Sequence, residues 1–305
     1  MLFDEKLSNR TQCNNSLHME RARKSLNEVA EAGEYVAVAV AAVGCLDTIT
    51  AVESVVRKTK AGSVMWLKAR GAGQDAAKSR AWGAVIKGLG HLKVLKTLDL
   101  EGMRGVESRA PLGGALARLN KTLKGLEIRD TDWLYPLPNT TGVLTGLVGL
   151  RISDNSQAVA LPEGVFDRLT ALDDLRAMGN GQLTFIPGLE KNTALRVLNL
   201  SHNNLTAIPS LDWKRSTRLE YLFLQNNRLT QIPAGVQQLT KLKYLDVSGN
   251  AIASLDNLNL SPSHRLTSNG TKVRLGGNPV CANATVGAHQ WSVVGTSLVK
   301  WDVSC

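Results

Sequence analysis

The stretch that decides the fold runs from Leu195 to Pro209 and reads LRVLNLSHNNLTAIP. Its apolar residues and Asn203 follow the spacing L-x-x-L-x-L-x-x-N-x-L-x-x-I. Leu198 and Leu200 alternate as in a strand that has one buried face. Asn203 comes at the bend that follows, where a side-chain amide can bond backbone groups of the neighbouring coils. The stretch therefore predicts one coil of a repetitive stack.

The same spacing recurs in the next two coils, at residues 219–233 and 242–252. The asparagines are 227 − 203 = 24 and 250 − 227 = 23 residues apart. A leucine motif with a period of about 20 to 29 residues is typical of leucine-rich repeats, and the chain resembles that family. The resemblance implies an α/β solenoid shaped as a curved horseshoe. Its parallel β-sheet would line the concave face, with short helices, 3-10 turns and loops on the convex face.

Outward from this stretch, about eight leucine-rich repeats are expected over residues 92–278. Their central leucine or its substitute is in turn Leu98, Leu126, Leu150, Leu175, Leu198, Leu222, Leu245 and Val273. The asparagine position holds Met103 and Thr131 in the first two coils and an asparagine in every later coil. The motif therefore sharpens towards the C-terminus.

The rest of the chain divides into three segments. Residues 1–34 form a polar N-terminal segment in which the apolar spacing predicts a helix. Residues 35–91 are expected to hold irregular strand–helix units, either an N-terminal cap or degenerate repeats. Within them, VAVAVAAV at residues 36–43 predicts a buried strand rather than the apolar part of a leader. Residues 279–305 are expected to form a C-terminal cap.

The composition limits the classes of protein and partner. The 305 residues are 43% hydrophobic and 20% charged, as in a soluble globular chain. The formal net charge of +10 is spread along the chain without an aromatic-rich motif, so nucleic acid is not expected as a partner. No apolar run reaches the ~18 residues of a membrane-spanning helix. Charged residues, among them Asp4, Glu5 and Lys6, interrupt any signal peptide near Met1.

The four cysteines lie in two pairs near the ends of the chain, Cys13 with Cys45 and Cys281 with Cys305. Disulfide-stapled caps often cover the terminal coils of secreted repeat proteins, and the alternative is four unrelated reduced thiols. The string Asn278-Pro279-Val280-Cys281 resembles the start of the C-terminal cap of extracellular leucine-rich repeat proteins. This resemblance implies a Cys281–Cys305 disulfide, and a Cys13–Cys45 disulfide is a second possibility.

Glycosylation sequons support an extracellular location. Nine asparagines precede x-Ser or x-Thr, more than chance would give. Asn120, Asn139 and Asn283 are the expected glycosylation sites, whereas a glycan on Asn199 would stand on the sheet face. We therefore expect an extracellular or cell-surface protein. A cytoplasmic location is the alternative, and it agrees with the missing signal peptide.

The sequence contains no recognisable catalytic or metal-binding set. G-x-S-x-G, H-E-x-x-H, C-x-x-C and P-loop motifs are missing, and the five histidines are scattered. We therefore expect no enzyme activity, no cofactor and no metal site.

The concave face is where a ligand is expected. Side chains that flank the inward leucines of each strand point away from the core and line up in columns from coil to coil. The expected ligand-binding residues are an aromatic patch, a basic stripe and two polar residues: Tyr221, Phe223 and Tyr244; Arg129, Arg151 and Arg176; Asn199 and Asp246. The acidic Asp99, Glu101 and Glu127 lie further along. Exposed strand positions also favour aromatic residues without any ligand, which is the alternative.

Together these features predict a non-enzymatic recognition module that binds a protein or peptide ligand, as secreted or cell-surface leucine-rich repeat ectodomains do. A free ectodomain and the extracellular part of a receptor-like kinase both agree with the sequence. The alternatives are an intracellular scaffold or regulator of an enzyme in GTPase or kinase signalling, and a secreted inhibitor of a hydrolase.

Overall fold

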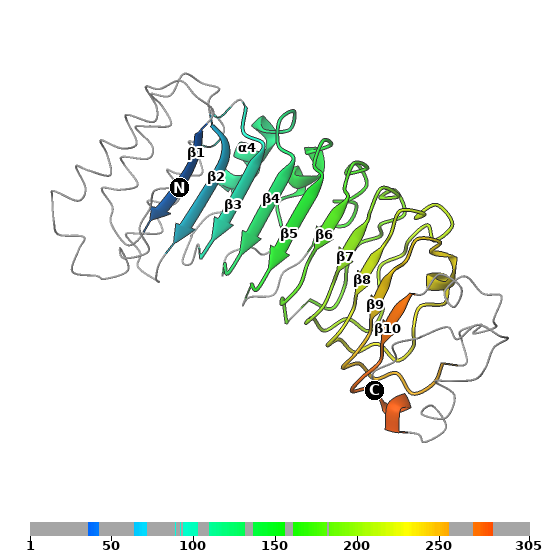
Figure 1. The fold of residues 1–305 in the computed structure, drawn as a ribbon. Helices are drawn as coiled ribbons and strands as arrows, with labels where there is room; N and C mark the ends of the chain where they lie inside the picture. Colours follow the sequence, from blue (N-terminus) through cyan, green and yellow to red (C-terminus); the bar gives the residue numbers. More distant parts are fainter. Residues whose placement is uncertain are drawn as a thin grey trace, which may run out of the picture. The chain divides into compact units, whose positions relative to one another are not determined.

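The structure is a computed structural model. It describes residues 36–42, 64–71, 89, 92, 94–102, 110–131, 137–155, 161–181, 183–255 and 271–282. These residues belong to two compact units, residues 1–157 and residues 158–305, and each unit is a stack of parallel strands in chain order (Figure 1). The helix expected in residues 1–34 lies outside the described residues.

Within its described residues, the first unit has five parallel strands in the order β1-β2-β3-β4-β5. They are β1 (Val36–Ala42), β2 (Val64–Gly71), β3 (Thr97–Glu101), β4 (Gly125–Arg129) and β5 (Gly149–Ser153). Leu98, Leu126 and Leu150 are aligned across β3, β4 and β5, and each is at most 2% exposed. The strand predicted from Val36 is confirmed, and it pairs with β2.

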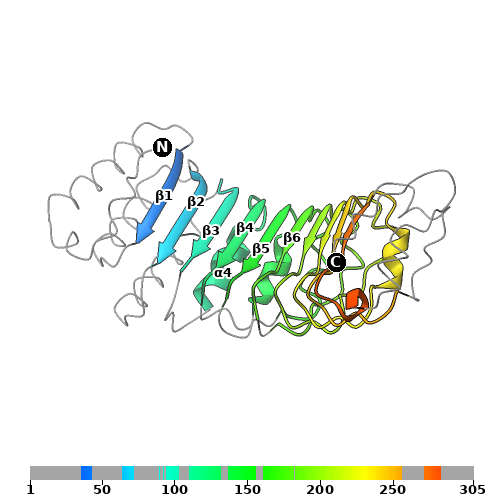
Figure 2. The same ribbon diagram turned by 60° about the horizontal axis from the view of Figure 1, so that its bottom comes forward.

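Helix α4 (Ala110–Arg118) connects β3 to β4 and lies on one side of the sheet of the first unit (Figures 1 and 2). Leu112, Ala115 and Leu116 are buried on one side of α4, and the 3-10 helix η3 (Asn139–Val143) follows β4. The sequence-based expectations include no helix at α4, although its apolar residues have helical spacing.

The described part of the second unit has five parallel strands in the order β6-β7-β8-β9-β10. They are β6 (Asp174–Arg176), β7 (Val197–Asn199), β8 (Tyr221–Phe223), β9 (Tyr244–Asp246) and β10 (Lys272–Arg274). The 3-10 helix η4 (Ala234–Gln238) lies between β8 and β9, and the 3-10 helix η5 (Pro279–Ala282) follows β10. All eight coils expected from residue 92 onwards have their strand at the predicted central residue, so the solenoid of parallel strands is confirmed.

The asparagine of the repeat joins neighbouring coils in the second unit. Asn227 accepts a hydrogen bond from the backbone N–H of Leu205 at 3.0 Å and donates to the carbonyls of Leu200 and Leu224 at 2.9 and 3.0 Å. Asn203, Asn250 and Asn278 make the same pattern of bonds. The predicted role of the asparagine in satisfying backbone groups is confirmed.

A left-handed residue precedes the asparagine position in every coil from β3 to β10. Its φ lies between 51° and 73° in all eight, at Gly102, Asp130, Asp154, Gly179, His202, Asn226, Gly249 and Gly277. Glycine, asparagine and aspartate tolerate this conformation best, and they occupy seven of the eight places. Each coil therefore turns at one fixed backbone corner.

Candidate functional site

The strands of each unit bury alternate residues and leave the others on an accessible face. In β4, Leu126 and Ile128 are buried, whereas Gly125, Glu127 and Arg129 are partly exposed. We call the face made by these alternate residues the open sheet face. All eight expected ligand-binding residues have strand positions on it, although Asp246 is only 5% exposed: Arg129 and Arg151 in the first unit, and Arg176, Asn199, Tyr221, Phe223, Tyr244 and Asp246 in the second.

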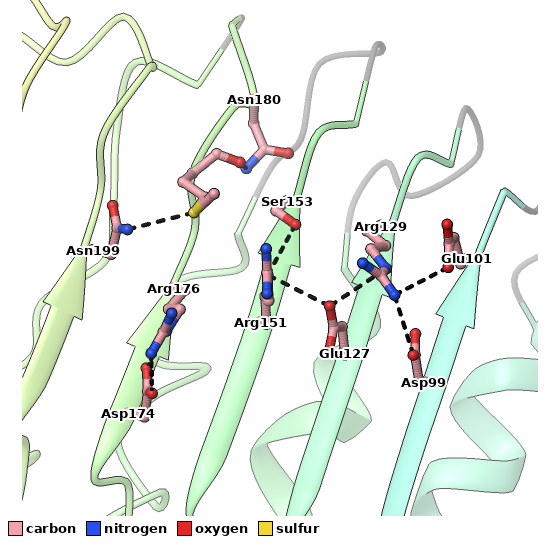
Figure 3. Close-up of polar contacts among 11 residues, drawn as sticks. Asp99, Glu101, Glu127, Arg129, Arg151, Ser153, Asp174, Arg176, Asn180 and Asn199 are labelled. Atoms are coloured by element: carbon pink, nitrogen blue, oxygen red, sulfur yellow. Dashed lines mark hydrogen bonds and ion pairs between the residues drawn. The ribbon is translucent and has the colours of Figure 1, made fainter. Parts of the chain in front are cut away.

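Five side chains of the first unit form an ion-pair network on this face, which we call the charge cluster (Figure 3). Nη2 of Arg129 lies 3.3 Å from Oδ2 of Asp99 and 3.0 Å from Oε2 of Glu101. Nε of Arg129 lies 3.4 Å from Oε1 of Glu127. Nε of Arg151 lies 3.5 Å from that same Glu127 oxygen. Arg129 is thus the centre of the charge cluster.

The charge cluster replaces the basic stripe expected from the sequence. Neighbouring strands are about 4.8 Å apart, so a long guanidinium side chain reaches acids on its own strand and on the next one. Two arginines and three carboxylates give the cluster a formal charge of 2 − 3 = −1. The side chain of Asp99 is only 8% exposed, so its ion pair with Arg129 offsets part of the cost of burying the carboxylate. Arg129 and Arg151 are therefore already engaged within the protein.

Arg176 in the second unit is engaged in the same way (Figure 3). Its Nε and Nη2 each lie 2.8 Å from an oxygen of Asp174, two residues earlier on β6. This two-pronged geometry is the strong form of an arginine–carboxylate pair. All three arginines of the expected stripe therefore have acidic partners.

Asn199 and Asp246 hold the backbone at the ends of their strands. Oδ1 of Asn199 accepts hydrogen bonds from the backbone N–H and the hydroxyl of Ser201, at 3.0 and 2.7 Å. Oδ1 of Asp246 makes the same two bonds with Ser248, at 3.1 and 2.6 Å. Nδ2 of Asn199 donates to Sδ of Met178 at 3.4 Å. These contacts give both residues a local structural role.

Tyr221, Phe223 and Tyr244 come together on β8 and β9, and we call them the aromatic shelf. The rings of Tyr221 and Phe223 are parallel within 6°, and their centroids are 6.5 Å apart. The rings of Phe223 and Tyr244 are tilted by 45°, with centroids 5.3 Å apart. All three side chains are partly exposed. The predicted proximity of these rings is confirmed, whereas their role in ligand binding stays a prediction.

Two basic residues of β10, Lys272 and Arg274, border the aromatic shelf, and we call them the cationic end. The guanidinium carbon of Arg274 lies 5.6 Å from the ring centroid of Tyr244, a cation–π contact. Both residues are exposed, and neither has an ion-pair partner among the described residues. The sequence puts Arg274 in the column of Asp246, but it is not among the expected binding residues. Its place beside an aromatic column was the signal that could have identified it.

The groups with shifted pKa values lie off the open sheet face. The hydrogen bond from Lys243 lowers the pKa of Glu220, and the same bond raises the pKa of Lys243. The hydroxyl of Ser210 lowers the pKa of Glu190 by hydrogen bonding. Surface contacts explain all three shifts. Within the described ranges, no three His, Cys, Asp or Glu side chains are placed to hold a metal ion.

The expected modification sites are only partly within the described residues. Asn139 is exposed and Asn120 is partly exposed. Sγ of Cys281 lies 3.3 Å from the carbonyl oxygen of Leu275. Cys13, Cys45, Cys305 and Asn283 lie outside the described residues, so the disulfides and the glycans stay predictions. No helix in the part of the chain that the structure describes is both long enough and apolar enough to cross a membrane.

The repeats and the parallel sheet agree with a known family. Residues 193–252 match the family model described as leucine rich repeat. Residues 193–252 therefore contain leucine-rich repeats. No curated sequence matches it.

Two solved structures share the fold. One is the ectodomain of the plant membrane receptor kinase GASSHO1/SCHENGEN3 from Arabidopsis thaliana, in complex with CASPARIAN STRIP INTEGRITY FACTOR 2. It is 22% identical with a TM-score of 0.52, over 71% of this chain and 27% of that chain. The other is an internalin from Listeria monocytogenes, 17% identical with a TM-score of 0.51, over 86% of this chain and 88% of that chain. This chain thus spans about a quarter of the length of the plant ectodomain.

Proposed function

We propose that this protein is a non-enzymatic recognition module that binds a protein or peptide ligand at the aromatic shelf. The observation that carries the proposal is the cluster of three partly exposed rings, Tyr221, Phe223 and Tyr244, on the neighbouring strands β8 and β9. Aromatic side chains are enriched among the residues that dominate protein interfaces, because they bury much apolar area at a low cost in side-chain entropy. Leucine-rich repeat proteins in general serve as protein-binding modules.

Three contacts hold the rings in place before any ligand arrives. Phe223 packs against Tyr244, the hydroxyl of Tyr244 donates to Oδ2 of Asp246 at 3.2 Å, and Arg274 covers the Tyr244 ring. A surface whose side chains are already ordered loses less entropy when a partner binds. The aromatic shelf therefore suits a ligand better than isolated exposed rings would.

A photo-crosslinking experiment tests the site. A photoreactive phenylalanine analogue replaces Phe223 in one variant of the full chain and Thr230, an exposed residue outside the strands, in a control variant. Extracts of the native source are irradiated with each variant, and crosslinked proteins are identified by mass spectrometry. We expect a partner that is captured only from position 223.

The affinity of that partner is then measured for two triple variants. Tyr221→Ala, Phe223→Ala and Tyr244→Ala together should weaken binding by at least ~2 kcal/mol, about thirtyfold. The matched control replaces three exposed threonines outside the strands, Thr184, Thr206 and Thr230, with alanine. Unchanged affinity in a folded aromatic variant, or equal losses in both variants, would refute the site.

We further propose that the protein works outside the cell or at its surface. The resemblance of the Cys281 segment to an extracellular cap and the exposure of Asn139 support this location. Mass spectrometry of native protein should find a Cys281–Cys305 disulfide and glycans at Asn120, Asn139 or Asn283. Free thiols and unmodified asparagines would instead favour the intracellular scaffold.

A further inference from the structure

The basic residues of the open sheet face fall into two groups. Arg129, Arg151 and Arg176 each lie within 3.5 Å of a carboxylate oxygen. Lys272 and Arg274 are exposed and have no ion-pair partner within the described parts of the chain. The cationic end therefore holds two positive charges that, among the described residues, an incoming anion can pair with at no loss of an existing ion pair.

We propose that the partner places an acidic side chain on the cationic end while it lays an aromatic side chain on the aromatic shelf. The inference rests on the proposed function, because it takes the shelf as the binding site. Charge complementarity at the edge of an apolar contact gives specificity and faster association. An acidic segment is thus the partner that this surface fits.

The neighbouring acid does not neutralise Arg274. Asp246 pairs with Arg274 in the register of β9 and β10, yet the two make no ion pair. Oδ1 of Asp246 is bound by Ser248, and its Oδ2 accepts the hydroxyl of Tyr244. The guanidinium of Arg274 lies over the Tyr244 ring instead. Arg274 is therefore held in position with its charge available.

Strand geometry sets the spacing of the two partner residues. The shelf begins on β8 and the cationic end is on β10, two strand spacings away, or about 10 Å. A peptide in the polyproline II conformation rises about 3.1 Å per residue with three residues per turn, so side chains three positions apart lie on one face and cover about this distance. We therefore infer an extended segment of a protein partner with an aromatic and an acidic side chain three positions apart, crossing the strands.

Selection from a random-sequence peptide library, displayed on phage and panned against the full chain, tests the inference. We expect enriched peptides to carry an aromatic residue and an Asp or Glu three positions apart. Their affinity should fall at least about tenfold in the double variant Lys272→Glu/Arg274→Glu. The matched control Lys214→Glu/Lys241→Glu makes the same charge change at exposed residues outside the strands and should alter affinity less than about twofold.

A second selection keeps the test independent of any loss of folding. Panning against Lys272→Glu/Arg274→Glu should enrich Lys or Arg in place of the acid and keep the aromatic residue. Two results would overturn the inference and leave the proposed function standing. In the first, the selected peptides need the aromatic shelf but carry no enriched Asp or Glu. In the second, panning against the charge-reversed variant selects the same peptides as panning against the wild type. Binding that ignores both the shelf and the cationic end would overturn both.

The source of the carboxylate is tested with the same peptides. Replacing the internal Asp or Glu of the peptide by Asn or Gln should abolish the difference in affinity between the wild type and the Lys272→Glu/Arg274→Glu variant. Amidating the C-terminus of the peptide should leave that difference unchanged. The opposite result would assign the contact to a chain terminus and overturn the inference of an internal acidic side chain.

Discussion

Apart from the Arg176–Asp174 pair on β6, the open sheet faces of the two units use the same strand positions in opposite ways. In the first unit the charged residues bind one another, and Arg129 serves three carboxylates at once. In the second unit the rings of β8 and β9 lie beside Lys272 and Arg274, whose charges are not paired within the described residues. A charged residue on such a face therefore indicates a ligand only when its charge is not already used within the fold.

The largest effect is expected where the backbone contacts of the coils are removed, since both faces depend on the stacking of coils. Asn227→Ala leaves the Leu205 N–H and the carbonyls of Leu200 and Leu224 without their partner. We expect a loss of about 3 kcal/mol in the free energy of unfolding, measured by urea titration with circular dichroism.

The neighbouring residue provides the control. Asn226 is exposed and has a φ of 57°, which glycine adopts without strain. Asn226→Gly should stay within about 0.5 kcal/mol of the wild type. Equal stability of the two variants would show that the buried amide contributes little.

The next prediction separates the two groups of arginines. Arg129→Ala leaves Asp99, Glu101 and Glu127 close together without their shared cation, so we expect a loss of about 2 kcal/mol in stability. Raising the salt concentration to about 1 M should restore part of it by screening the carboxylates. Arg274→Ala should cost less than about 0.5 kcal/mol, because no acid among the described residues pairs with Arg274. Similar losses in the two variants would contradict the contrast between the faces.

Two glycines, one in each unit, give a comparison with a smaller expected change in stability. A Cβ at Gly149, on the first unit's open sheet face, would meet nothing within 4 Å, whereas a Cβ at Gly235 would collide with the ring of Trp213. We expect Gly235→Ala to lower the free energy of unfolding by about 1 kcal/mol through overpacking. Gly149→Ala should raise it by about 0.5 kcal/mol, because alanine suits a strand better than glycine does. Thermal and urea unfolding of both variants measure the difference, and a reversed order would contradict the packing around Trp213.

The smallest effect concerns the residues that precede the strands. In the second unit, Glu220 and Lys243 directly precede β8 and β9, and Nζ of Lys243 lies 2.9 Å from Oε2 of Glu220. In the first unit, the residues that directly precede β3 and β4 are both lysines, Lys96 and Lys124. The lowered pKa of Glu220 stabilises the fold above its ordinary value of 4.5, and the gain is lost as the pH falls through the lowered pKa. The raised pKa of Lys243 stabilises the fold below 10.5, and that gain is lost as the pH rises through the raised pKa.

Paired urea titrations of wild type and Lys243→Met across the pH range measure this contribution. The difference should be small, constant between about pH 6 and about pH 9, and absent in strong acid and strong alkali. Lys124→Met, the counterpart in the first unit, should show no such window, and a window of the same size there would contradict the assignment to the ion pair.

The sequence predicts the strands well because their signal is local. A leucine pair at alternate positions and an asparagine a few residues later determine both the buried face and the bend, so β3 to β10 lie at the predicted residues. Thr131 shows how the position works without asparagine, since its N–H and hydroxyl bond to Oδ1 of Asn155 in the next coil. Helix α4 was not predicted, because it lies in the segment between β3 and β4 and the repeat motif does not determine the length of such segments.

Side-chain partners could not be predicted in the same way. The columns show that Arg129 has acids nearby, but they do not show that one guanidinium reaches Asp99, Glu101 and Glu127 together. That outcome depends on rotamers and on the spacing of neighbouring strands. Arg274 was overlooked although its column lies beside the aromatic residues, because its cation–π contact with Tyr244 of the preceding coil depends on the rotamers of both side chains.

The left-handed corners recur at one fixed position in every coil from β3 to β10, so whole coils are the units of the array. Each corner lies one residue before the asparagine position, so a gain or loss of one complete coil, such as 227 − 203 = 24 residues, returns every later corner to its place. A shorter insertion between the corners would have to bulge out of the stack. Duplication of whole coils can therefore lengthen such an array while single residues of the open sheet face diversify, so length and specificity can evolve separately.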